Sequence, residues 1–249
     1  MTGPPDPPDP ERIRAILLDI EGTTTPIDFV TRVLFPYARE RGGDFLARRA
    51  SEVRDDLALL FSEHEADERA GQSPPSWRSE SPEAVLDSAV SYVHWLMDRD
   101  RKSTALKALQ GRIWEEGYRA GHLLGQVYPD VPRAFARWRS QGREIAIFSS
   151  GSALAQKLLF SRSEAGDLTP FLRAHFDTTT GAKADADSYR KIAHALRLEP
   201  ASVLFLSDVT AELDAARNAG MTTGLCVRGG EPAASPGHAV VRTFDEVLP

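Results

Sequence analysis

Short, continuous apolar runs alternate with helical segments through the second half of the chain, and this alternation is what most constrains the fold. Such runs are typical of strands buried on both faces of a sheet. We expect strands at 13–18, 144–151, 202–208 and 222–227, and helices at 130–142, 152–160, 188–198 and 211–220. Asp130 is a possible cap of the helix at 130–142. Alternating elements of this kind predict an α/β fold with a doubly wound, mostly parallel, Rossmann-like sheet.

Residues 27–125 have a different sequence pattern, which indicates helices. The segment SPEAVLDSAVSYVHWLMDRD offers Ser81 as an N-cap and Pro82 at the first helical position. Before it, residues 62–81 are polar and contain Gly and Pro, which predicts a mobile surface loop. The strand at 13–18 has no partner nearby in sequence. We therefore expect a core of 1–26 and 126–249, with 27–125 inserted as an all-helical domain.

Composition excludes several classes of protein. The formal net charge is -6 without a long basic run, so nothing indicates nucleic-acid binding. A single cysteine, Cys226, excludes an internal disulfide and a cysteine zinc site. No apolar stretch approaches the roughly 20 residues that cross a bilayer, and the N-terminus lacks the pattern of a signal peptide. We expect a cytoplasmic monomer with a small-molecule partner.

Three of the predicted strands end in reactive side chains, in the strings LLDIE, IFSS and FLSD. In an open parallel sheet, ligands bind outside the carboxyl ends of the strands. One polar strand end has little meaning, but three from one sheet predict a functional site.

Asp19 and Glu21 follow the first strand. An aspartate fixed there can attack phosphorus as a covalent nucleophile. Glu21 is near enough to protonate the leaving oxygen and then to activate water. Gly22 permits a sharp turn, and Thr23 can hydrogen-bond a phosphate oxygen or its own turn. The alternative is a simple turn at a strand end.

Asp208 ends the strand at 202–208. Facing Asp19, it would repel that carboxylate unless a cation joined them, and oxygen ligands of this kind suit Mg²⁺. Glu212 could hold metal-bound waters or Ser207. The alternative role for Asp208 is the N-cap of the following helix.

Ser149, Ser150 and Lys183 complete the candidate set. Two small hydroxyls beside a glycine at a helix start form an anion-binding corner, although a helix cap is the alternative. Lys183 can offset the charge of Asp19 and of a transferring phosphoryl group. Its alternative is an ordinary solvated lysine.

Four strings in order, LLDIEGTT, IFSSG, GAKADADSYRKI and FLSDVTAELDAA, resemble the four motifs of the haloacid-dehalogenase superfamily of phosphohydrolases. More narrowly, DIEGTTTP, GYRAGHL, VYPDVPRAF and GMTTGLCVRGG resemble the enolase-phosphatase (acireductone synthase) family of methionine salvage. The resemblance extends from about residue 13 to residue 230.

The resemblance implies a role for each candidate residue. Asp19 would accept the phosphoryl group, and Glu21 would be the acid/base. Asp19, Glu21 and Asp208 would hold one Mg²⁺, while Ser149, Ser150 and Lys183 would bind the substrate phosphate. The substrate would be 2,3-diketo-5-methylthiopentyl-1-phosphate, which is enolised and then dephosphorylated to the acireductone. The helical insert would be a cap that closes over the site.

Several alternatives stay open. The proton in the enolisation could be taken by Glu21 or by a residue of the cap. The same core could act on another small phosphate ester, such as a sugar phosphate. A dehalogenase is disfavoured, because attack on carbon has no use for a phosphate-binding cluster. A non-catalytic relative is disfavoured because Asp19, Lys183 and Asp208 are all present.

Overall fold

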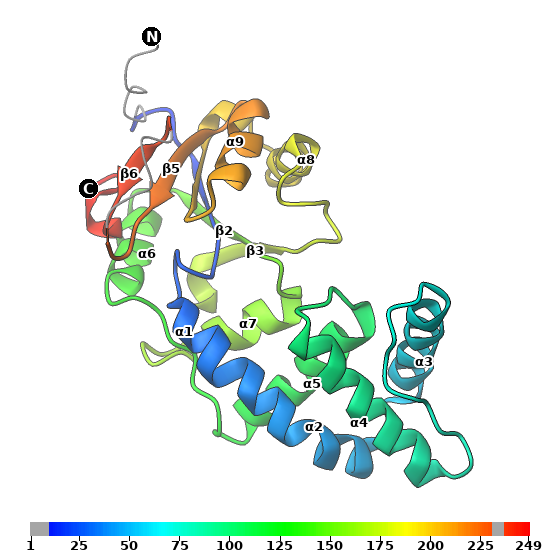
Figure 1. The fold of residues 1–249 in the computed structure, drawn as a ribbon. Helices are drawn as coiled ribbons and strands as arrows, with labels where there is room; N and C mark the ends of the chain where they lie inside the picture. Colours follow the sequence, from blue (N-terminus) through cyan, green and yellow to red (C-terminus); the bar gives the residue numbers. More distant parts are fainter. Residues whose placement is uncertain (1–9, 231–236) are drawn as a thin grey trace. The chain divides into compact units, whose positions relative to one another are not determined.

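The computed structural model describes residues 10–230 and 237–249, and it divides the chain into two compact units (Figure 1). Unit 1 takes the described residues up to Val30 and those from Leu124 onward, and unit 2 is Thr31–Leu123. Within these ranges no helix is long and apolar enough to cross a membrane.

Unit 1 is built on a six-stranded parallel sheet with the order β3-β2-β1-β4-β5-β6 in the described residues. Its strands are β1 (Ala15–Leu18), β2 (Glu144–Phe148), β3 (Leu172–Phe176), β4 (Val203–Ser207), β5 (Thr222–Cys226) and β6 (Ala239–Val241). In register, Leu18 lies between Ile147 of β2 and Leu206 of β4. The strand order reverses between β1 and β4, which is where open sheets of this type bind ligands.

Helices cover both faces of this sheet (Figure 1). Alternate strand residues such as Leu17 and Phe205 pack against Tyr189 and Leu213 of α8 (Ala186–Leu196) and α9 (Thr210–Asn218). The other helices of unit 1 that contact the sheet are α6 (Val131–Ser140), beside β2, and α7 (Ala153–Ser161), beside β3. The predicted doubly wound α/β fold is confirmed.

Two strands were absent from the sequence prediction, β3 and β6. β3 lies at the edge of the sheet and reads LRAHF, so Arg173 and His175 interrupt the apolar pattern. β6 has only three residues. Both escape a search for continuous apolar runs, because such runs mark strands buried on both faces.

Unit 2 is helical. After α1 (Ile27–Phe29) in unit 1 and a π-helical segment (Val30–Leu34), its helices are α2 (Phe35–Arg49), α3 (Arg54–Arg69), α4 (Pro82–Asp98) and α5 (Thr104–Arg119). Ser81 caps α4 as predicted, because its side chain accepts a hydrogen bond from Ala84 N at 3.1 Å. The predicted loop at 62–81 is wrong for 62–69, which belong to α3. Gly and Pro begin only at Gly71, and the preceding residues favour a helix.

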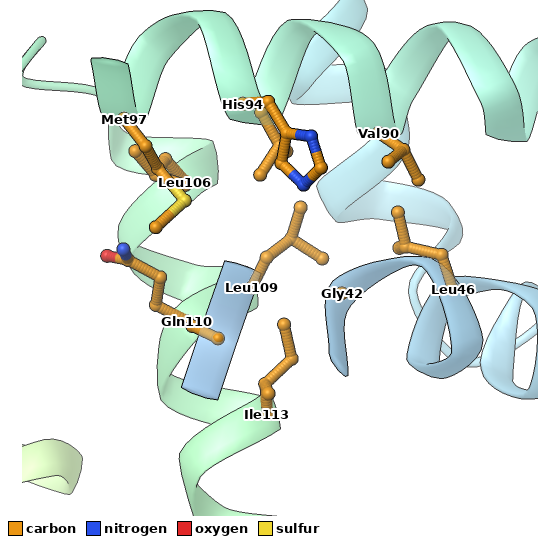
Figure 2. A pocket seen from close by; sticks show the side chains of 11 residues that line it. Gly42, Leu46, Val90, His94, Met97, Leu106, Leu109, Gln110 and Ile113 are labelled. Carbon is orange, nitrogen blue, oxygen red and sulfur yellow. The ribbon is translucent and has the colours of Figure 1, made fainter. Parts of the chain in front are cut away.

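The interior of unit 2 is closely packed. Figure 2 shows side chains of α4 meeting those of α5 and α2 around a cavity of about 10 Å³. The labelled residues are Gly42, Leu46, Val90, His94, Met97, Leu106, Leu109, Gln110 and Ile113. A space of this size is at the lower limit for one water molecule. It is a packing gap and not a binding site.

Candidate active site

The residues that follow β1, 19–25, form a tight loop, which we call the β1 loop. The N–H groups of Thr23, Thr24 and Thr25 all donate to the carbonyl of Ile20, at 3.2, 2.9 and 2.9 Å. Asp19 N donates to Leu206 O at 3.0 Å, so Asp19 continues the β1–β4 ladder. The loop is therefore anchored at the point where the strand order reverses.

Gly22 is required by two features of this loop. Its φ is +69°, in the left-handed region that favours glycine. A Cβ on Gly22 would also overlap the carboxylate of Asp208 and come within 2.6 Å of its Cγ. The turn thus brings the loop backbone against the carboxylate that ends the neighbouring strand.

Lys183 bridges two carboxylates. Its Nζ lies 2.6 Å from Asp19 Oδ1 and 2.7 Å from Glu212 Oε2. The side chains of Lys183 and Asp19 are only 9% and 6% exposed. Burial alone would lower the pKa of Lys183, but Asp19 and Glu212 together raise it, so the amine carries its charge. The alternative interpretation of Lys183 as a solvated lysine is wrong.

The position of Lys183 is fixed through its backbone. The hydroxyl of Tyr189 donates to Lys183 O at 2.7 Å, and Ser188 Oγ donates to Ala182 O at 2.7 Å. Both residues lie in the first turn of α8, which Asp185 caps. The loop before α8 therefore presents Lys183 from a rigid support.

Glu212 also accepts a hydrogen bond from Ser207 Oγ at 3.0 Å. The contact with Ser207 was anticipated, but the ion pair with Lys183 was not. The N-cap of α9 is Val209, without a side-chain hydrogen bond. Asp208 is therefore not the cap of this helix, and the alternative role is excluded.

Burial and the charge of Asp19 raise the pKa of the carboxyl groups around it. Burial and then the charge of Asp19 raise the pKa of Asp208 to about 6. The Glu21 side chain reaches solvent, yet the protein around its carboxyl group and the charge of Asp19 raise its pKa. The charge of Lys183 acts to lower the pKa of Asp19, Glu21, Asp208 and Glu212, but it does not outweigh burial at any of them.

This excess of negative charge bears on metal binding. Within residues 10–230 and 237–249, no group of three or more His, Cys, Asp or Glu side chains is arranged to hold a metal. Mg²⁺ needs only one or two carboxylates, because waters and substrate oxygens complete its coordination. Asp19 and Asp208 supply hard oxygen donors where negative charge is unbalanced, so the residues present fit a divalent cation.

Ser149 and Ser150 lie just beyond β2, at the same edge of the sheet. Ser149 is buried, and its Oγ accepts a hydrogen bond from Gly151 N at 3.1 Å. Among the described contacts, none joins Ser149 to Asp19 or Lys183. The cap of α7 is Ser152, which accepts from Ala155 N at 3.2 Å, so the helix-cap alternative for Ser149 and Ser150 is wrong. Ser150 is exposed.

Arg228 makes an unpredicted contact to the β1 loop. It lies two residues after β5 and donates from Nε and Nη2 to the carbonyl of Thr23 at 2.9 and 2.6 Å. Asp130, expected as a possible cap of the helix at 130–142, makes no such bond to α6 and pairs with Arg228 instead. An arginine at the carboxyl end of a predicted strand was the available signal.

Comparison with known proteins gives a consistent result. Residues 13–220 match a family model described as haloacid dehalogenase-like hydrolase. The chain is 53% identical to enolase-phosphatase E1 of Synechococcus elongatus, covering 96% of this chain and all of that protein. It is 46% identical to enolase-phosphatase E1 of Yersinia enterocolitica, covering 94% and 96%.

A solved structure is similar over nearly the whole chain. The UTR4 protein of Saccharomyces cerevisiae is 31% identical to this chain, with a TM-score of 0.75, and the match covers 94% of this chain and all of that one. A dehalogenase structure with 20% identity and a TM-score of 0.54 shares the fold alone.

Proposed function

The chain belongs to the haloacid dehalogenase-like hydrolases and, within them, to the enolase-phosphatase E1 family, and from this premise we propose that it converts 2,3-diketo-5-methylthiopentyl-1-phosphate to the acireductone and phosphate in methionine salvage. The observation that carries the proposal is the buried contact between Asp19 and Lys183 at the carboxyl end of the central strands. We expect a cytoplasmic monomer, with residues 27–125 as its cap domain.

In the phosphatase step, an oxygen of Asp19 attacks phosphorus, and the bond from phosphorus to the substrate oxygen breaks. Glu21 gives a proton to that leaving oxygen. Glu21 then takes a proton from water as the water attacks the phosphorus of the aspartyl-phosphate, which releases phosphate and restores Asp19. The raised pKa of Glu21 suits both directions of proton transfer.

The other residues balance charge and hold the phosphate. The ammonium of Lys183 offsets the negative charge that gathers on the phosphoryl oxygens. Ser149 and Ser150 donate hydrogen bonds to the substrate phosphate. One Mg²⁺, held by Asp19, Asp208 and the Glu21 segment, would supply further positive charge at the phosphoryl group and at the enolate oxygen.

An enolisation precedes this step, and it removes a proton from the carbon next to a carbonyl. Glu21 is one candidate for the base and a residue of unit 2 is the other. The second candidate function is hydrolysis of another small phosphate ester, such as a sugar phosphate, because the residues around Asp19 handle only the phosphoryl group.

The test is to mix the enzyme and Mg²⁺ with the diketo phosphate and to follow enol absorbance and free phosphate together. We expect an enol signal followed by stoichiometric phosphate. Release of phosphate from sugar phosphates at an equal rate would favour the second function. An enol signal without phosphate would contradict the phosphatase step.

A matched pair of variants tests the nucleophile. Asp19→Asn should lose turnover by at least about 1000-fold, because an amide oxygen does not replace the carboxylate in the attack. Asp214→Asn changes a half-exposed carboxylate of α9 that pairs with Arg217 and His238. It should keep turnover within about twofold, because no described contact joins Asp214 to Asp19 or Lys183. Phosphate release by Asp19→Asn at the rate of the unchanged enzyme would exclude this role.

A further inference from the structure

Arg228 lies outside the four motifs, yet its side chain donates two hydrogen bonds to the backbone of the β1 loop. Its Nε and Nη2 donate to the single carbonyl oxygen of Thr23, at 2.9 and 2.6 Å. Arg228 and Thr23 are 205 positions apart in the sequence. We propose that Arg228 is a positioning residue for the reaction, which acts by fixing the β1 loop and with it Asp19 and Glu21.

The hydrogen bonds of the loop backbone show why this contact matters. The carbonyl of Ile20 accepts three bonds from inside the loop, and Thr25 O accepts one from Gly22 N at 2.9 Å. The carbonyls of Thr23 and Thr24 point outward instead. Thr24 O accepts from Tyr128 N at 2.9 Å, and Thr23 O accepts from Arg228. These two contacts tie the outer side of the loop to the rest of unit 1.

The guanidinium of Arg228 is itself held on every side. Its Nη1 pairs with Asp130 Oδ2, and the two side chains are each 8% exposed. Its Cζ lies 4.5 Å from the centre of the Tyr128 ring and 4.2 Å from that of Phe244. A planar cation this close to two aromatic rings is oriented by contact with the rings as well as by charge.

Asp130 is fixed in turn. Its Oδ2 accepts from Thr243 Oγ1 at 3.0 Å and from Phe244 N. Burial would raise the pKa of Asp130, but the hydrogen bonds from Arg228 and Phe244 outweigh burial and lower it. The charged pair therefore joins the loop after β1, the start of α6 and the segment after β6.

Only arginine meets this geometry. Two N–H groups on one edge of the guanidinium reach Thr23 O while the third nitrogen reaches Asp130. A lysine keeps the charge opposite Asp130 but has a single nitrogen on a flexible stem. Arg228→Lys therefore loosens the loop and still leaves Asp130 with a cationic partner.

The experiment compares Arg228→Lys with Arg143→Lys. Arg143 also donates to backbone carbonyls, those of Ile13 and Pro10 at 3.2 and 2.9 Å, at the amino end of β1. We expect kcat of Arg228→Lys to fall about 10- to 100-fold with KM changed by less than about twofold, because displaced reacting groups lose rate. Arg143→Lys should keep both constants.

Hydrogen exchange provides a readout that needs no substrate. In Arg228→Lys, the amides of the peptide that contains 19–25 should exchange about tenfold faster, while those of β4 keep their rate. In Arg143→Lys, this peptide should exchange as in the unchanged protein. Asp130→Asn should shift the β1 loop peptide in the same direction as Arg228→Lys, but less.

The proposal is overturned if folded Arg228→Lys keeps its kcat and the exchange rate of the loop peptide. It is also overturned if Arg143→Lys loses as much kcat, because the effect would then be general loss of packing. The inference depends on the proposed function only for the kinetic measurement. Failure of that function would appear as no phosphate release by the unchanged enzyme, and failure of this inference as unchanged exchange.

Discussion

Gly22→Ala tests the geometry of the site through one added carbon. Two separate effects are expected at this position. The first is conformational, because Gly22 has a φ of +69°, and an L-residue in the left-handed region is destabilised by about 1–2 kcal/mol. The second is steric, because the new Cβ would overlap the carboxylate of Asp208.

The overlap cannot be relieved within the loop. Gly22 N is bonded to Thr25 O, and the next three amides are bonded to Ile20 O, so the loop resists a shift. Asp208 must move instead. Forcing one extra methyl into a filled site destabilises by about 1–3 kcal/mol, which gives a total of about 2–5 kcal/mol with the conformational effect. A displacement of about 1 Å at a reacting group lowers turnover by about 100-fold.

Gly142→Ala is the matched control. Gly142 has a φ of +76°, and a Cβ built on it meets open space. It should show the conformational loss alone, about 1–2 kcal/mol, with normal turnover. The free energy of unfolding of both variants is measured by urea denaturation, and turnover by phosphate release. Equal destabilisation of the two variants, with full turnover in Gly22→Ala, would refute the close contact between Gly22 and Asp208.

Three further outcomes are expected. Lys183→Met leaves Asp19 and Glu212 buried without their cation, so unfolding should become easier by about 3 kcal/mol near pH 7. The loss should shrink as the pH falls, because burial raises the pKa of both carboxyl groups and protonation relieves their repulsion. A loss that grows in acid, in urea titrations, would contradict this. Burial and then the charge of Lys157 lower the pKa of His175 to about 4, whereas a histidine in the unfolded chain has a pKa of about 6.5. The stability that depends on the neutral ring is therefore complete above about pH 6.5 and is lost as the pH falls toward 4. His175→Gln should therefore remove about 2 kcal/mol of the acid destabilisation, after allowance for solvent screening, and an unchanged slope of stability against pH would exclude it. Burial raises the pKa of the Cys226 thiol to about 12. Its alkylation by iodoacetamide, measured by mass spectrometry, should therefore be at least about 1000-fold slower in the native protein than in urea. Rapid labelling of the native protein would contradict the burial of Cys226.

Local chemistry determined which parts of this molecule were predictable. β1, β2, β4 and β5 follow from short apolar runs, because both faces of these strands are covered. The meeting of Asp19 and Asp208 at one edge follows from parallel pairing, which aligns carboxyl ends. The cap at Ser81 follows from its own neighbours. Each of these inferences needs only residues close together in sequence, or the rule for ligands at strand ends.

The contacts that went unpredicted depend on packing between distant segments. Asp130 was expected to cap a helix, which is a common role for an aspartate at a helix start. Its carboxylate pairs instead with Arg228, which lies 98 positions away in the sequence. The second partner of Lys183 was missed for the same reason. Glu212 offers one carboxylate to Ser207 and Lys183 together, and only the fold brings all three to one point.

The shared position of Lys183 has a consequence for the order of events in the proposed reaction. Before phosphoryl transfer, Asp19 and Glu212 both hold the ammonium, at 2.6 and 2.7 Å. Once Asp19 has become an aspartyl-phosphate, its carboxylate charge is gone and its attraction for Lys183 is weakened. Glu212 still holds the ammonium, and Ser207 still holds Glu212. The cation therefore stays beside the phosphoryl group while water attacks, and it is in place when Asp19 regains its charge.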